Sequence, residues 1–387
     1  MFVHDILKVL YAPHKVFKEI LQKPRLFGPL LIMILFAAAQ AGFFYTVMSK
    51  SYVEQTLPKP EQLDMWTENA TLWTGTAGLT IRDNYDDYIN GTYYGNRSIE
   101  FSIANSDQVS MALDNIESVN CYGPDGYKNL SLRIKLIESQ KPRNATIYLF
   151  SLSPSNYFYY DLTKEVFSST ADAWNNITIP VGSDKWSNNG AAANWQNITG
   201  LKLEFTWPGN ASITLRVDGL FFRGIFKSVT DMAGTSYIVN FLMTAFTQFM
   251  LQWLILSGLI YIISRGFGAK IAWMPIMVCI GFALIPMFIQ AVVNTATHST
   301  LPNLYYPLEL MGGVQGEFET AYKPISETTA LVAQIGAFLQ GIVYVWTIAL
   351  CTMATRALTE FKWVKSLLAS AAAFLITIMI LNFVLGF

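Results

Sequence analysis

The sequence predicts an α-helical membrane bundle of five transmembrane helices combined with an all-β domain, an extracytoplasmic jelly-roll sandwich. Composition is the first observation, since 52% of the 387 residues are hydrophobic and only 14% are charged, whereas soluble domains average about 25% charged residues. The second is a set of five long apolar runs, and the third is a polar segment, residues 51–226, with strand-like alternation. The near-zero net charge gives no reason to expect a nucleic-acid partner.

The chain opens on an amphipathic arm, residues 1–26. Two apolar helical stripes with lysines between them run along it: Val3, Ile6, Leu7 and Leu10, then Val16, Phe17, Ile20 and Leu21. Pro13, between the stripes, suits the first turn of a second helix. Such an arm either lies in the headgroup plane with its lysines toward anionic lipid, or packs on the cytoplasmic ends of the spans.

Five apolar runs are long enough to cross a hydrocarbon core, which takes roughly 20 residues: 27–48, 238–263, 271–293, 329–354 and 365–386. The only charged residue within them is Lys365, at the first position of the last run. The first run contains AAAQA, which resembles a signal-peptide cleavage site, but apolar sequence continues beyond it, so we expect a retained span. Pro275 and Pro286 should kink the third span.

Basic residues in the short connections predict the orientation. They gather in the arm and in the turns 264–270 and 355–365, which share one side of a five-span bundle. By the positive-inside rule that side is the cytoplasm. The N-terminus is then cytoplasmic, whereas residues 51–226, the outer loop 294–328 and the C-terminus are extracytoplasmic, in a protein of the plasma membrane.

Glycosylation triplets point to the same orientation. All eight Asn-X-Ser/Thr triplets of the chain lie between the first and second spans: Asn69, Asn90, Asn96, Asn129, Asn144, Asn176, Asn197 and Asn210. About three would occur there by chance, so the excess indicates N-linked glycans. The alternative is a composition effect in an exposed domain rich in Asn and Thr.

Short alternating strands fill residues 51–226. In 129–138, alternate positions are apolar (Leu130, Leu132, Ile134 and Leu136), and similar patterns recur at 98–104, 109–116, 145–152, 174–181, 200–207 and 211–222. Short strands at regular spacing with polar turns favour an antiparallel sandwich or jelly roll. The segment is long enough to bury a core of its own.

The order of YKNLSLRIKL, ATIYLFSLSPSNYFYYDLT, AWNNITIPV, NWQNITGLKLEFTW and ITLRVDGLFF resembles galactose-binding-type β-sandwiches, over roughly residues 80–224. These are the jelly rolls of many carbohydrate-binding modules. The resemblance implies a structural calcium in some members, held by an Asp of the final strand, and Asp218 matches that position. Calcium takes six to eight oxygen ligands, so the alternative role of Asp218 is to cap a strand edge or to pair with an arginine.

Aromatic side chains are the candidates for glycan contact, because the apolar faces of sugar rings stack on them. The segment is rich in them: Trp174, Trp186, Trp195, Trp207, Tyr157, Tyr159 and Tyr160. Most aromatics of a sandwich belong to its core. Trp186 and Trp195 lie in the loop 183–195, rich in Ser, Asn and Gly, so we expect these two to be exposed.

The arm and the spans resemble the Yip family of membrane proteins. Residues 13–20, PHKVFKEI, follow the P-x-x-x-F-x-x-I pattern common before the first span of prokaryotic members, and LFGPLL and a five-span bundle come after it. The resemblance covers roughly residues 5–48 and 230–387, and the 51–226 insert departs from the compact members. It implies a fold more than an activity, although eukaryotic relatives are linked to Rab GTPases and to vesicle formation or membrane shaping.

The polar side chains inside the spans are amides: Gln40, Gln248, Gln252, Gln290, Asn294, Gln334, Gln340 and Asn382. We expect hydrogen bonds between helices, the usual partner of an amide in hydrocarbon. Ala333, Ala337 and Gly341 repeat every four residues, as do Ala38 and Gly42, which lets helices approach closely. An ion-coupled pump would need an ionisable group deep in a span, whereas an amide-lined path for a neutral solute stays open.

Catalytic patterns are missing from the sequence. It has no zinc-protease helix, no nucleophile elbow and no phosphate loop. The three histidines, His4, His14 and His298, fall on both sides of the membrane. Three scattered cysteines, Cys121, Cys279 and Cys351, indicate neither a disulfide nor a metal cluster.

We therefore expect a non-enzymatic surface glycoprotein whose sandwich binds a glycan or a partner in the envelope, and whose bundle anchors an assembly with other membrane proteins in the lipid bilayer. Many glycosylation triplets without disulfides suggest an archaeal envelope. A transporter or permease-associated subunit with a substrate-capturing outer domain is one alternative, and a membrane-shaping or trafficking factor is another. In the outer loop, Glu309, Glu317 and Glu319 are candidates to contact the sandwich.

Overall fold

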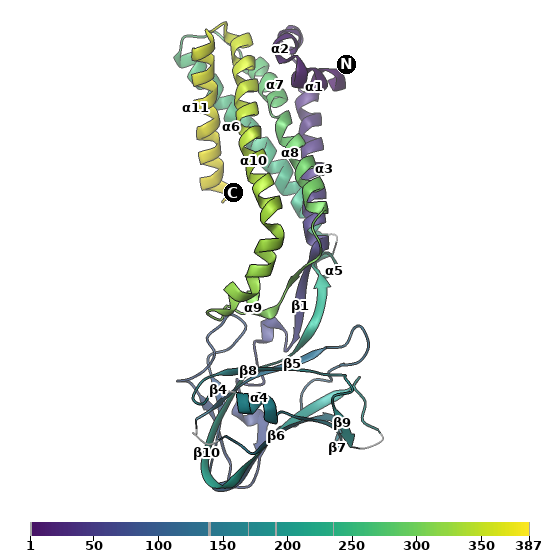
Figure 1. Ribbon diagram of the computed structural model, residues 1–387. Coiled ribbons are helices and arrows are strands. Elements are labelled where there is room, and N and C mark those ends of the chain that lie inside the picture. Colours follow the sequence, from purple (N-terminus) through teal and green to yellow (C-terminus); the bar gives the residue numbers. More distant parts are fainter. Residues whose placement is uncertain (1, 138–140, 169, 190–191, 235, 387) are drawn as a thin grey trace. The chain divides into compact units, whose positions relative to one another are not determined.

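The computed structural model describes residues 2–137, 141–168, 170–189, 192–234 and 236–386, and it has two compact units (Figure 1). The helical unit comprises Met1–Ser51, Ser228–Leu304 and Ser326–Phe387, and the β unit comprises Tyr52–Lys227 and Tyr305–Ile325. The predicted 51–226 domain is thus joined by a second, distant piece of the chain.

The helical unit contains the predicted spans. Five helices are long and apolar enough to cross a membrane: Phe27–Lys50, Ser236–Gly266, Trp273–Ser299, Glu317–Thr359 and Trp363–Phe383. In Figure 1 they are α3 (Phe27–Lys50), α6 (Ser236–Gly266), α7 (Trp273–Ala283) with α8 (Ile285–Ser299), α10 (Glu317–Thr359) and α11 (Trp363–Leu385). Short α5 (Val229–Ala233) precedes α6. The prediction of five helical spans is confirmed.

The third span is broken once. It ends as α7 at Ala283 and resumes as α8 at Ile285, so that Pro286 lies in the first turn of the second piece. The expected kink at Pro286 is therefore present, because proline removes one helical hydrogen bond and crowds the preceding turn. Pro275 lies in the first turn of α7, where a proline is tolerated, and it causes no kink.

Close helix packing occurs where α3 meets α7. An added Cβ at Gly28 would lie 2.0 Å from the Phe282 ring, and one at Gly281 would lie 2.5 Å from the Pro29 Cβ. Only glycine permits this approach. The predicted small-residue stripe on α10 has no such role, since it is exposed and a Cβ at Gly341 would meet nothing within 4 Å; the same holds for a Cβ at Gly42.

The N-terminal arm forms α1 (Phe2–Tyr11) and α2 (Pro13–Gln22), with Pro13 in the first turn of α2 as predicted. The two helices pack against α3 and α7. Val9, Val16 and Phe17 are fully buried in the bundle core. Of the two alternatives for the arm, the structure shows packing on the spans, because Ile6, Val16, Phe17 and Ile20 of its apolar stripes are buried, although Leu7 is 53% exposed.

The β unit is built on one antiparallel sheet of eleven strands. The strands are β1 (Ser51–Leu57), β2 (Trp73–Gly75), β3 (Thr80–Asn84), β4 (Ser98–Leu113), β5 (Asn129–Leu136), β6 (Asn144–Ser151), β7 (Ser153–Asp161), β8 (Asn175–Pro180), β9 (Ser187–Asn189), β10 (Ile198–Ser228) and β11 (Leu304–Tyr306). Short helical segments η1 (Pro60–Gln62), η2 (Ala70–Leu72), α4 (Thr163–Ser168) and α9 (Leu308–Met311) lie between them.

Two long strands, β4 and β10, carry the sheet from one layer of the sandwich to the other (Figure 1). The first half of β10 pairs with β6, and the second half pairs with β5. Ladder irregularities between Thr206 and Ile213 mark the change. One core fills the space between the layers, and Leu203 and Leu215, one from each half of β10, are fully buried in it.

The predicted strands 200–207 and 211–222 are a single strand, as are 98–104 and 109–116. Hydrophobic alternation pauses at Pro208–Asn210, but the pairing between β4 and β10 resumes after a bulge, so the break in the pattern is not a break in the strand. The predicted outer loop 294–328 is also largely ordered structure: it holds the end of α8, β11, α9 and the start of α10.

Candidate functional site

Three tyrosines form an open aromatic surface on the β6–β7 part of the sandwich. Tyr148 comes from β6, and Tyr157 and Tyr159 come from β7. Their ring centroids lie 5.4 Å (148 to 157), 6.2 Å (148 to 159) and 6.3 Å (157 to 159) apart. Tyr159 is 40% exposed and the other two are half-buried. We call this cluster the tyrosine face.

Polar side chains from neighbouring strands fix the tyrosine face. The Lys202 ammonium lies 3.9 Å from the centroid of the Tyr148 ring and pairs with Glu204 at 2.9 Å. The Tyr148 hydroxyl donates to Glu204 at 3.4 Å, and the Asn189 amide donates to the Tyr157 hydroxyl at 2.7 Å. Partial burial, and then the Glu204 charge, raise the pKa of Tyr148, so its phenol stays a neutral hydrogen-bonding group.

Strand parity explains the tyrosine face and could have revealed it. Ile147 and Leu149 on β6 and Phe158 on β7 point into the core, so the residues between them face outward. The β6–β7 register pairs Tyr148 with Tyr159. Aromatic residues at outward positions of strands, such as Tyr148, are therefore better candidates for an exposed surface than the aromatic residues of the loops.

Trp186 and Trp195 are not the exposed pair that the sequence predicted. Trp186 is 7% exposed, and its indole N–H donates to the Pro180 carbonyl at 2.6 Å. Trp195 is half-buried and stacks on Phe158 with centroids 3.8 Å apart. The prediction of exposure was wrong because the loop folds back and both rings pack against the sandwich core.

Asp218 lies in a buried pair of carboxyl groups. Its partner is Asp64, and both side chains are almost fully buried. The Asp218 oxygens accept hydrogen bonds from the backbone N–H of Ile89 at 2.6 Å and of Gly219 at 2.7 Å. Burial, and then the Asp64 carboxylate, raise the pKa of Asp218 well above its ordinary value, because both disfavour its charged form.

The residues around Asp218 do not fit a calcium site. The two Asp64 oxygens accept from the Gly95 N–H, the Gly219 N–H and the Thr67 hydroxyl. Hydrogen-bond donors therefore already face every carboxyl oxygen of the pair, whereas calcium needs six to eight oxygen ligands. Among the described residues no group of three acidic, His or Cys side chains could hold a metal ion. The geometry favours a structural role for Asp218.

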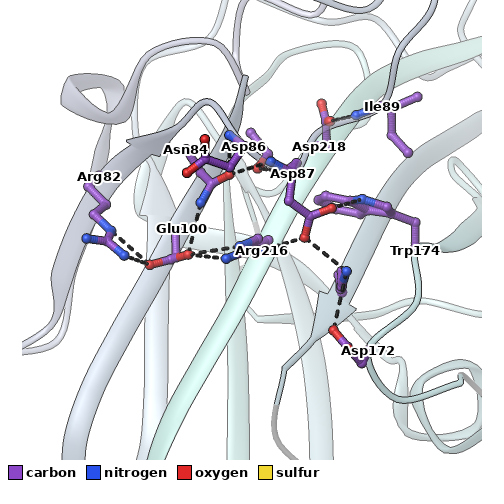
Figure 2. Close-up of polar contacts among 12 residues, drawn as sticks. Arg82, Asn84, Asp86, Asp87, Ile89, Glu100, Asp172, Trp174, Arg216 and Asp218 are labelled. Carbon is purple, nitrogen blue, oxygen red and sulfur yellow. Dashed lines mark hydrogen bonds and ion pairs between the residues drawn. The ribbon is translucent and has the colours of Figure 1, made fainter. Parts of the chain in front are cut away.

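An ion network covers the other layer of the sandwich (Figure 2). Glu100 lies between Arg82 and Arg216, and Arg216 also pairs with Asp87. Burial opposes ionisation of Asp87 and Glu100, but hydrogen bonds outweigh it and lower the pKa of both carboxyls. Lys135 and Arg216 donate to Asp87, and Arg216 and Arg82 donate to Glu100. Charged pairs thus occupy this surface, in contrast to the open tyrosine face.

The segment 305–325 is held to the sandwich by buried ion pairs. Arg223 of β10 contacts Glu54 of β1 at 2.8 Å and Glu309 of α9 at 2.6 Å. Arg133 of β5 contacts Glu317 at 2.8 Å. The expected contacts of Glu309 and Glu317 with the sandwich are confirmed. Glu319 is exposed.

The amides of the spans converge on one cavity of about 310 Å³ in the helical unit. Side chains of α3, α6, α8, α10 and α11 line it: Phe36, Gln40, Gln248, Gln252, Met287, Gln290, Ala291, Asn294, Gln340, Val343, Tyr344, Thr347, Phe374, Ile378, Leu381 and Asn382. We call it the amide cavity. Gln334 does not line it and is exposed on α10.

The expected hydrogen bonds between span amides form at one place. The amide of Gln290 on α8 donates to that of Gln340 on α10. Apart from Gln334, the other predicted amides gather around the same space without pairing among the described residues. The sequence identified the polar residues, but their convergence depends on how five helices are rotated.

All eight glycosylation asparagines lie in the β unit. Asn129 and Asn197 are half-buried, and the other six are exposed. The three cysteines are free and buried.

Comparison with known proteins gives a family match for the second half of the chain. Residues 193–385 match the Yip1 domain family. The match covers the end of the sandwich and the four spans that follow it, but not the arm and first span, to which the sequence resemblance also extended. No curated protein matches the chain.

Several solved structures resemble the sandwich. The family 11 carbohydrate-binding module from Clostridium thermocellum, in complex with a mixed-linked tetrasaccharide, is 15% identical (43% of this chain, 94% of that one, TM-score 0.28). A β-1,2-glucanase from Parabacteroides distasonis is 14% identical (40% and 24%, TM-score 0.30). A carbohydrate-binding module of the β-sandwich superfamily is 13% identical, and the chain spans 57% of it (40% of this chain, TM-score 0.28). At this level the likeness says nothing about a ligand of this chain.

Proposed function

Residues 193–385 match the Yip1 domain family, and five helices are long and apolar enough to cross a membrane. From this premise we propose that the chain is a non-enzymatic, membrane-anchored protein of this family whose sandwich binds glycans on the tyrosine face. One observation carries the proposal: three tyrosine rings, held by hydrogen bonds and one cation, lie on an open sheet surface. The helical unit anchors the sandwich in the lipid bilayer.

The chemistry of the tyrosine face suits a sugar. Aromatic faces bind the apolar C–H faces of sugar rings, while phenol hydroxyls keep a polar edge. Glu204 and Asn189 add an acceptor and a donor beside the rings, which can bond sugar hydroxyls. Because neighbouring strands already position these groups, binding would order few side chains, and that saves conformational entropy.

The tyrosine face is tested with the full-length protein in lipid nanodiscs on an array of neutral microbial and plant polysaccharides. We expect the Tyr157→Ala/Tyr159→Ala variant to bind at least about tenfold more weakly, since two stacking contacts are lost. Tyr122→Ala is the matched control, because Tyr122 is an exposed tyrosine elsewhere in the same unit, at 60% against 40% for Tyr159. Unchanged retention in the double variant would contradict the site, and release of sugar fragments from a bound polysaccharide would contradict binding without turnover.

We also propose that the β unit lies outside the cell and carries N-linked glycans in the native envelope. The exposure of six acceptor asparagines supports this, as does the positive charge of the connections on the opposite side. Intact cells treated with a protease should lose peptides of residues 52–227 but keep those of the turn 264–270. Mass spectrometry of native protein should find glycan on Asn69 or Asn210; unmodified peptides for all eight triplets would contradict the glycan assignment.

The membrane-shaping alternative gains no support from the arm. Its Val16 and Phe17 are buried in the bundle, so they are not free to insert into a lipid surface. The amide cavity is an observation in favour of the other alternative, in which the bundle handles a solute.

A further inference from the structure

The amide cavity has hydrogen-bonding capacity that the protein itself does not use. Gln290 and Gln340 bond to each other. The remaining lining amides make no side-chain hydrogen bond among the described residues: Gln40, Gln248, Gln252, Asn294 and Asn382. Each amide offers two donor hydrogens and one acceptor oxygen. Helix-to-helix bonding, the usual reason for amides in a span, therefore explains only one pair.

Two of the polar lining residues are also nearly closed to outside water. Gln252 on α6 is 4% exposed and Thr347 on α10 is 1% exposed. The Thr347 hydroxyl oxygen is buried and has no hydrogen-bond partner in the described part of the chain. An unpaired polar group in such a place costs free energy. The cavity therefore favours a bound molecule that forms hydrogen bonds with its lining.

The lining also limits the charge of a molecule that could bind in the cavity. None of the described residues around the cavity is acidic, basic or a histidine. A charged ligand would find no counter-charge there and would lose its hydration. Amides and hydroxyls both donate and accept, and a sugar hydroxyl does the same.

We propose that the amide cavity binds a neutral, polyhydroxylated group of the size of one sugar ring. Its volume of about 310 Å³ lies at the lower end of small-molecule sites, which run from about 300 to 1,000 Å³. Phe36, Tyr344 and Phe374 supply ring faces on the apolar side, with Tyr344 and Phe374 in edge contact at 5.4 Å between centroids. The group is either a free monosaccharide or the headgroup of a neutral glycolipid.

The experiment separates this site from the tyrosine face by using full-length protein that carries Tyr157→Ala and Tyr159→Ala throughout. One arm adds free glucose, galactose, mannose or N-acetylglucosamine to phosphatidylcholine nanodiscs. The other arm uses nanodiscs that contain monogalactosyl diacylglycerol. Native mass spectrometry measures bound ligand, and purification avoids sugar detergents because their headgroups would compete.

The variants are Gln252→Leu and Thr347→Val, which keep side-chain size, with Gln334→Leu as the control, an exposed amide on α10 outside the cavity. We expect saturable binding in one arm, weakened roughly three- to tenfold by each cavity variant and unchanged by Gln334→Leu. The arm that binds identifies the source of the sugar.

Three results would overturn the proposal. The first is the absence of saturable binding in both arms, as for a cavity filled by water alone. The second is equal affinity in the cavity variants and the control, and the third is tighter binding of glucose 6-phosphate than of glucose. Because the tyrosine face is disabled throughout, none of these results bears on the proposed function of the sandwich.

Discussion

Replacing Arg223 by methionine is expected to destabilise the β unit by about 3–5 kcal/mol. The Arg223 guanidinium is buried beside two carboxylates, Glu54 and Glu309. Few other hydrogen-bond donors contact these carboxylates. Glu54 is nearly inaccessible and still accepts from the N–H groups of Gly224 and Leu308. Without the arginine, two carboxylates remain close together in a poorly solvated place, and an uncompensated buried charge is costly.

The loss of stability should be visible as faster amide hydrogen exchange. We expect amides of β1, of the second half of β10 and of the segment 305–325 to exchange faster in Arg223→Met, measured by mass spectrometry on the full chain in nanodiscs. Arg82→Met is the control, since the Arg82 side chain is 65% exposed although it contacts Glu100, and an exposed pair contributes about 0–1 kcal/mol. Equal effects of the two substitutions would mean that the buried cluster has no special role.

The second large effect concerns pH and the carboxyl pair of Asp64 and Asp218. Burial and the Asp64 charge raise the pKa of Asp218 in the folded chain, while in the unfolded chain it keeps its ordinary value near 3.8. Between these two pKa values the folded state binds more protons than the unfolded state. The free energy of unfolding therefore falls as pH rises through this range, and the stabilisation present in acid is lost. Each unit of difference corresponds to about 1.4 kcal/mol.

Asp218→Asn removes this titration. Asn has only one acceptor oxygen, so its NH2 group would face the backbone N–H of either Ile89 or Gly219. We therefore expect the variant to be less stable than wild type near pH 5, by about 1–3 kcal/mol. The difference should narrow as the pH rises, because the wild type loses the stabilisation that protonation of Asp218 gives. Some slope should remain in the variant, because burial also raises the pKa of Glu68.

Thermal unfolding of the full chain from pH 5 to 8, followed by near-ultraviolet circular dichroism, measures both slopes. Asp184→Asn, an exposed aspartate of the same unit, should leave the wild-type slope unchanged. A difference between wild type and Asp218→Asn that stays constant over this range would contradict a raised pKa of Asp218 in the folded chain.

Local pattern predicted most of the fold. Long apolar runs located all five helices, because crossing a bilayer demands length and apolarity from each helix separately. They did not show that α10 begins at Glu317, well before the predicted start at residue 329. Period-two alternation located β5, β6 and β8 in the same way. The same pattern wrongly predicted two strands in place of β4 and two in place of β10. The residues at their bends lose the alternation, but the ladder between β4 and β10 continues.

The sites depended on features that no local pattern carries. Asp218 was identified, but its partner Asp64 precedes β2 by several residues, and only the closed sandwich brings the two together. Tyr148 is an exception, because the alternation of β6 already indicates that its side chain faces outward. The polar loop around Trp186 predicts an exposed indole. In the structure the ring packs on the core, and its N–H donates to the Pro180 carbonyl.

The dependence of the sandwich on residues 305–325 also sets the order in which the protein can fold as it is made. Leu308 belongs to a buried cluster with Ile89, Tyr94 and Phe221, and Glu309 is a partner of Arg223. When the ribosome has completed β10, these groups do not yet exist, and α6, α7 and α8 must be synthesised before them. At roughly 5–20 residues per second, the nascent sandwich waits several seconds with an unfinished surface. A chaperone that shields it during this interval, or insertion of the helices without pausing, would therefore govern the yield of correctly folded protein.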